Sequence, residues 1–203
     1  MMENLDIRTV TGGPLEVNTY VVGPGGGQEC LLIDPGAEEA RVREAVSGRR
    51  VEAVLLTHGH FDHMLHAQPF LDEGARLYVH QLDAPALRSP ALNLSGVINT
   101  QLVLPQADVL LGEGDTVEEA GVRFTVLHTP GHTPGGVCYA CGNVLFSGDT
   151  LFYRSYGRID LPGGDGQEMA ASLARLMQLP ADTVAYPGHG MKTKIAWERG
   201  SYA

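Results

Sequence analysis

The chain has 203 residues, of which 43% are hydrophobic and 19% are charged, and its formal net charge is −10. This composition excludes a disordered chain, because such chains are polar and highly charged. The length predicts a single domain over residues 1–203.

The acidic balance argues against nucleic acids and membranes as partners, because both attract basic surfaces. Three cysteines are too few for a disulfide framework and predict free thiols in a reducing compartment. The first residues lack the basic segment and the apolar stretch of a signal peptide. We therefore expect a cytoplasmic protein.

The first half of the chain predicts strands that alternate with helices. Short apolar and β-branched runs predict strands over residues 18–22, 29–34, 51–56 and 77–80. Helices are predicted over residues 37–46 and 64–73, and Gly74 is expected to end the second of them. The glycine-rich residues 23–27 predict a hairpin loop, whereas residues 81–103 predict no regular element.

The second half begins with strands and ends with a helix and a further strand. Strands are predicted over residues 115–118, 122–127, 136–140, 144–146 and 183–186. Residues 167–179 predict an amphipathic helix, because Met169, Leu173 and Leu176 fall on one face. Strands and helices in this order favour an α/β protein in which outer helices cover the sheets.

The motif THGHFDH at residues 57–63 is the strongest chemical signal in the sequence. It brings His58, His60, Asp62 and His63 together directly after a predicted buried strand. A histidine tag would lie at a terminus, and this cluster does not. Imidazole and carboxylate ligands without a thiolate suit zinc, iron or manganese.

Three further loops carry ligand-type side chains, and each follows a predicted strand. His132 lies in PGHTPGG, Asp149 in SGDT and His189 in PGHG. Loops at strand ends commonly form the sites of α/β proteins, so we expect these loops to meet the first motif. Five histidines and two aspartates suffice for two metal ions if one carboxylate bridges both.

The four motifs, in this order and at this spacing, resemble those of the metallo-β-lactamase superfamily over residues 18–189. The resemblance implies a four-layer αβ/βα sandwich with a metal site at one edge between its two sheets. It also implies that one metal is bound by His58, His60 and His132. The second metal would then be bound by Asp62, His63 and His189, with Asp149 as the bridge.

The segment at residues 148–165 is most similar to glyoxalase II, a hydroxyacylglutathione hydrolase, and to its short bacterial relatives. True β-lactamases commonly have a cysteine at the position of Asp149, whereas RNA-processing members favour basic surfaces. This acidic chain, with an aspartate at position 149, resembles neither group. Full-length glyoxalase II adds a helical C-terminal domain that helps to bind glutathione. We expect this domain to be absent here, so the glutathione site is not carried over.

Several other residues each allow two interpretations. Arg154, Tyr156 and Arg158 follow the bridging aspartate and are candidates for binding the substrate, although Arg158 could instead pair with Asp160 or Asp165. Asp34 either supports the metal site, as the resemblance implies, or caps the helix that begins near Ala37. The remaining side chains are expected to be structural or supporting: Cys138, Cys141, His66, His80 and His128.

These features predict a metal-dependent hydrolase of small-molecule thioesters such as S-D-lactoylglutathione. Two Zn²⁺ ions, with iron or manganese as alternatives, would share a bridging hydroxide that attacks the thioester carbonyl. Asp62 would orient this hydroxide and Asp149 would hold both metals, so both count as catalytic. The alternatives are a persulfide dioxygenase with one iron on His58, His132 and Asp149, and a lactone hydrolase.

Overall fold

The structure is a computed structural model that describes residues 5–202, and its first part is a mixed sheet. Within these residues the sheet has six strands, in the order β1-β2-β3-β4-β5-β6. The first three strands are antiparallel and the last four are parallel, with β3 common to both parts. The strands are Leu5–Gly12 (β1), Val17–Pro24 (β2), Glu29–Ile33 (β3), Arg50–Leu55 (β4), Arg76–His80 (β5) and Val109–Leu111 (β6).

A second sheet follows, with strand order β14-β13-β10-β9-β8-β7 among the described residues. Its strands are Thr116–Glu119 (β7), Val122–His128 (β8), Val137–Cys141 (β9), Val144–Gly148 (β10), Val184–Pro187 (β13) and Thr193–Lys194 (β14). The short strands Leu151–Phe152 (β11) and Ser155–Tyr156 (β12) form a separate hairpin. The pairing of β10 with β13 is parallel, and the other pairings of this sheet are antiparallel.

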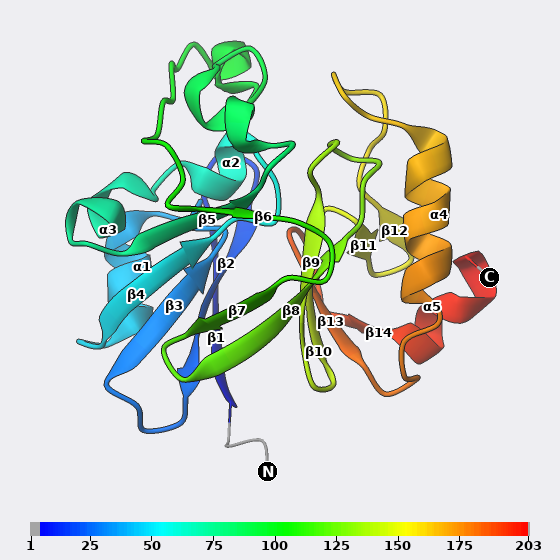
Figure 1. Cartoon of the computed structure of the whole chain (residues 1–203), viewed down its shortest axis with the longest axis horizontal. Helices are drawn as coiled ribbons and strands as arrows, with labels where there is room; N and C mark the ends of the chain where they lie inside the picture. Colours follow the sequence, from blue (N-terminus) through cyan, green and yellow to red (C-terminus); the bar gives the residue numbers. More distant parts are fainter. Residues whose placement is uncertain (1–4, 203) are drawn as a thin grey trace.

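Helices cover the outer face of each sheet (Figure 1). The first sheet carries Glu39–Val46 (α1), Phe61–Met64 (α2) and Gln68–Asp72 (α3), and the second carries Gly166–Leu176 (α4) and Ile195–Tyr202 (α5). The predicted four-layer αβ/βα sandwich is therefore confirmed. None of the helices in residues 5–202 combines the length and apolar character needed to span a membrane.

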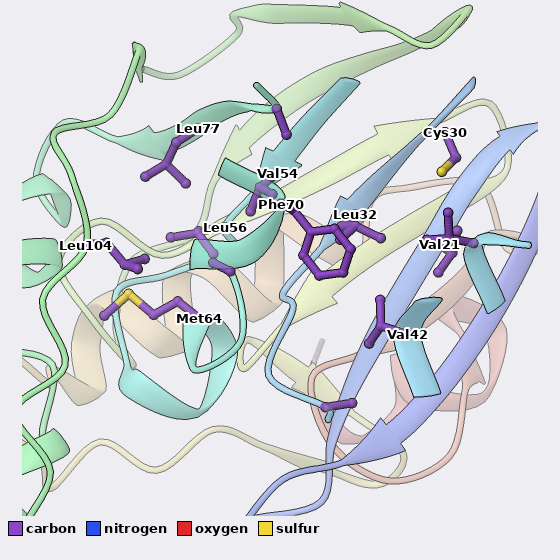
Figure 2. Packing of buried hydrophobic residues seen from close by; sticks show 14 of the residues in the cluster. Val21, Cys30, Leu32, Val42, Val54, Leu56, Met64, Phe70, Leu77 and Leu104 are labelled. Carbon is purple, nitrogen blue, oxygen red and sulfur yellow. The ribbon is translucent and has the colours of Figure 1, made fainter. Parts of the chain in front are cut away.

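Three apolar clusters hold the layers together, because strand side chains alternate between the two faces of a sheet. In β3, Cys30 and Leu32 face the outer helices, whereas Leu31 and Ile33 face the second sheet. Figure 2 shows the outer cluster of the first sheet, where Phe70 of α3 packs with Leu32 and other strand residues. The third cluster lies between the second sheet and α4 and α5.

Most predicted elements are present, but the predicted helix over residues 64–73 is wrong. The chain forms α2 and α3 instead, and Pro69 lies in the first turn of α3. Proline lacks the N–H that a continuous helix would need at this position. Gly74 does end α3, with φ at +98°.

Candidate metal centre

The four loops predicted to meet all reach one edge of the two sheets. Residues 57–63 span the loop after β4 and the first residues of α2, and His132 lies between β8 and β9. Asp149 follows β10 directly, and His189 follows β13. The structure therefore places all seven predicted ligands in one cluster, where they form overlapping groups of converging donor atoms.

The first group consists of three buried histidines, His58, His60 and His132. The Nδ1 atom of His60 lies 3.1 Å from Nε2 of His58 and 2.9 Å from Nε2 of His132. Burial, together with the neighbouring histidines, lowers the pKa of His58 well below its usual value and that of His60 to about 3. These two rings are therefore neutral, and the three converging nitrogens form a site suited to a cation.

The second group is formed by Asp62, His63 and His189. Asp62 Oδ2 lies 3.6 Å from His63 Nε2 and 3.2 Å from His189 Nε2. His63 is fully buried, whereas the side chain of His189 is 26% exposed. The second group is therefore the one that solvent reaches more easily.

Asp149 lies between the two groups and contacts both. Its Oδ2 is 3.4 Å from His132 Nε2, and its Oδ1 is 3.4 Å from His63 Nε2. Burial alone would raise the pKa of Asp149, but the attraction of His63 and the other histidines outweighs burial and lowers this pKa. Asp149 is therefore an anion in the position expected for a bridging ligand.

Two polar atoms of the cluster provide a test of whether a metal fits. Among the described residues, His63 Nε2 and Asp149 Oδ1 are buried without a hydrogen-bond partner. Buried polar atoms in proteins nearly always have a partner, and a coordinated ion satisfies a lone pair equally well. The donor set of imidazole and carboxylate suits zinc, iron or manganese.

The nitrogens that face away from the cluster are held by other groups. His132 Nδ1 donates to the carbonyl of Arg158 at 2.7 Å, and His189 Nδ1 donates to the carbonyl of Leu15 at 3.0 Å. Such bonds fix the ring and direct Nε2 toward the centre of the cluster.

Asp34 supports the cluster in the same way. Its carboxylate lies 2.9 Å from His63 Nδ1 and accepts hydrogen bonds from the backbone N–H and the hydroxyl of Thr57. The interpretation of Asp34 as a helix cap is wrong, since Glu38 precedes the first residue of α1.

Asp83 is a supporting residue that the sequence analysis missed. Its carboxylate accepts hydrogen bonds from Gly59 N–H at 2.8 Å, the Thr133 hydroxyl at 2.8 Å and Gly135 N–H at 2.7 Å. Gly59 separates His58 from His60, and Thr133 follows His132, so one buried side chain joins two ligand loops. Asp83 lies in a segment without a recognised motif, and its only sequence signal is an isolated carboxylate.

The loop of His189 is held from the opposite sheet. Asn18 of β2 donates its backbone N–H to the Gly188 carbonyl at 2.7 Å and its side-chain amide to the carbonyls of Pro187 and Gly190. A Cβ atom on Gly188 would collide with Asp149 Oδ1 and lie 2.6 Å from His63 Cε1. Glycine is therefore needed where this loop passes the cluster.

A cleft of about 770 Å³ opens beside the cluster and is bounded by residues of both metal groups. Tyr156 and Arg158, two predicted substrate-binding residues, also line it. The guanidinium of Arg158 forms two 2.7 Å contacts with Asp160, which is the ion pair considered as its alternative role. Arg154 is not among the described residues that line the cleft, and its guanidinium stacks on the Tyr153 ring.

The two cysteines of the C-x-x-C sequence face opposite sides of the second sheet. Cys138 is buried beneath α4, whereas Cys141 is half-buried and packs against the core between the sheets. Burial raises the pKa of both thiols. Both thiols are free, and the buried position predicted for the pair holds for Cys138.

Comparison with known protein sequences assigns the part of the chain that contains all seven predicted ligands to one family. The sequence model of one protein family, described as the metallo-beta-lactamase superfamily, matches residues 12–189. "Probable metallo-hydrolase YqgX" of Bacillus subtilis (strain 168) is 33% identical over 95% of this chain and 93% of its own. "Hydroxyacylglutathione hydrolase" of Salmonella typhi is 36% identical over 79% of this chain but only 57% of its own.

Solved structures are similar over almost the full chain. "BLEG-1 B3 metallo-beta-lactamase" superposes with a TM-score of 0.90 and 34% identity, covering 97% of this chain and 98% of its own. "TTHA1623 in a di-iron-bound form" superposes with a TM-score of 0.81 and 38% identity, covering 96% of this chain and 98% of its own. The chain therefore belongs to the metallo-beta-lactamase superfamily.

Proposed function

We propose that this chain is a metal-dependent hydrolase that cleaves thioesters of a small-molecule thiol, such as S-D-lactoylglutathione. The observation that carries the proposal is the pair of ligand groups joined by Asp149 at the floor of an open cleft. The likeness to a metallo-hydrolase and to a hydroxyacylglutathione hydrolase supports the same reaction class.

Two ions would be held by the residues already described. His58, His60 and His132 would bind one, and Asp62, His63 and His189 the other, with Asp149 between them. Bound there, the ions would supply a Lewis acid and would lower the pKa of water toward about 7. Zinc is our first expectation, and the di-iron form of a 38% identical structure makes iron the main alternative.

The residues of the chain would position the substrate and move one proton. The oxygen of water forms a bond to the acyl carbon, the C–S bond breaks, and the thiolate leaves with the electron pair. Asp62 lines the cleft and would accept the proton of the attacking water. A thiol has a pKa of about 8.5, so its anion leaves with little help from an acid.

A persulfide dioxygenase is the first competing function. It would use His58, His132 and Asp149 for one iron, which leaves Asp62, His63 and His189 without a role. The convergence of this second group favours a binuclear hydrolase instead. The likeness to a B3 metallo-beta-lactamase makes β-lactam hydrolysis a second competitor, and lactones are a third.

The test is thiol release by metal-loaded protein from S-D-lactoylglutathione and from a neutral thioester, with an EDTA-treated control. Saturable release that disappears with the metal and returns on its addition would support the proposal. O₂ uptake with a thiol persulfide, or opening of a cephalosporin without any thioester cleavage, would replace it with the corresponding competitor.

A further inference from the structure

The cleft beside the metal centre has mainly apolar walls. Its apolar residues come from separate parts of the chain and include Leu15, Phe61, Leu94, Val97, Phe152 and Leu161. Val97 is 74% exposed and Leu15 is 54% exposed, so these side chains are open to a ligand rather than packed into the core. Contiguous exposed apolar surface of this kind commonly marks a binding site.

The cleft offers little to a charged thiol carrier. Arg158 is the one lysine or arginine among the described residues that line it, and Asp160 occupies both its Nε and its Nη2. Arg154 and Lys192 are not among the described residues that line the cleft, and their cationic groups lie over the rings of Tyr153 and Tyr186. Glutathione carries two carboxylates and one ammonium group, and a carboxylate that bound Arg158 would have to share its guanidinium with Asp160.

We propose that the cleft selects thioesters with an apolar acyl chain on a small, neutral thiol. This inference rests on the proposed thioester hydrolysis and names its substrate class. Clefts of about 300–1,000 Å³ accommodate drug-sized ligands, so an octanoyl group on a short thiol fits the space available. The hydroxyl of a D-lactoyl group would gain nothing from walls of leucine, valine and phenylalanine.

A series of N-acetylcysteamine thioesters from acetyl to octanoyl tests the selection, with the metal-loaded full chain and S-D-lactoylglutathione for comparison. Each buried methylene should raise kcat/KM about fourfold until the cleft is full. Cleavage of all chain lengths at equal kcat/KM, or a preference for S-D-lactoylglutathione over the hexanoyl and octanoyl thioesters, would overturn the inference while leaving thioester hydrolysis intact.

A matched pair of variants locates the selection in the cleft wall. Val97→Ser should lower kcat/KM for the octanoyl thioester about fivefold to tenfold and for the acetyl thioester less than twofold. Val103→Ser is the control, because Val103 is 50% exposed and is not among the described residues lining the cleft. Equal losses in the two variants, or equal losses for both substrates, would contradict the assignment.

Binding can be measured without any reaction. S-alkyl-N-acetylcysteamine thioethers lack the thioester carbonyl and cannot be hydrolysed at that position. Calorimetry of the metal-loaded protein should show about fourfold tighter binding per methylene with a negative heat-capacity change. Such binding by a protein that cleaves no thioester would support the apolar cleft and refute the proposed hydrolysis. Affinity that is independent of chain length would overturn the cleft assignment itself.

Discussion

The carboxylate of Asp34 lies 2.9 Å from Nδ1 of His63, and both side chains are almost completely buried. The same carboxylate accepts two hydrogen bonds from Thr57, the residue that precedes the first histidine of the cluster. Asp34 thus fixes the ring of His63 and the start of the ligand loop together, and it leaves His63 Nε2 directed toward Asp149.

We expect Asp34→Asn to weaken metal binding about 10–100-fold, because second-sphere partners of ligating histidines contribute this much. An amide presents one acceptor where the carboxylate presents two, so His63 loses its orientation. Competition with a chromogenic chelator would measure the affinity. Asp182→Asn, at an exposed position, is the matched control and should bind metal like the unmodified chain.

Asp149→Asn should reduce both metal occupancy and turnover. Asparagine lacks the second anionic oxygen, and Asp149 is the residue whose two oxygens contact different groups. We expect turnover to fall by several orders of magnitude, with fewer metal ions per chain by elemental analysis. Full occupancy together with unchanged turnover would refute the role of Asp149 as a bridge.

The ligand positions could be predicted because each lies in a short motif directly after a buried strand, as His58 after β4 and Asp149 after β10 show. The supporting residues could not. Asp83 reaches Gly135 across a separation of 52 residues, and only the packing of the two sheets creates that contact. Short elements such as β12 and β14 were missed because two residues carry no periodic pattern.

Asp83→Asn should loosen the first ligand group in particular. Asparagine has an NH2 group in place of one carboxylate oxygen, and NH2 cannot accept a hydrogen bond. Either Gly59 N–H or Gly135 N–H therefore loses its acceptor. We expect about 1–3 kcal/mol less stability toward urea and a preferential loss of the ion bound by His58, His60 and His132. Equal loss of both ions would indicate general destabilisation instead.

Gly188→Ala should damage the cluster while leaving the sheets in place. Its new methyl group would collide with the Asp149 carboxylate and the His63 ring. We expect weaker metal binding with an unchanged far-ultraviolet circular dichroism spectrum. Gly200→Ala in α5 is the matched control, since a Cβ atom there meets no atom within 4 Å. Comparable metal affinity in the two variants would contradict the close approach of this loop.

The last prediction concerns stability at low pH and two histidines outside the cluster. The rings of His80 and His128 stack with centroids 4.2 Å apart and planes 12° from parallel. Two causes lower the pKa of His80 to about 4: burial has the larger effect, and the neighbouring His128 has the smaller one.

His80 should therefore make the folded protein less stable as the pH falls from about 6.5 to about 4. In this range the unfolded chain binds a proton at His80 and the folded chain does not, so protonation favours unfolding. Replacing His80 with glutamine removes this difference. Urea unfolding at pH 7.5 and pH 5 should show a larger loss of unfolding free energy in the unmodified chain than in His80→Gln. Equal losses would mean that His80 titrates alike in the folded and unfolded states.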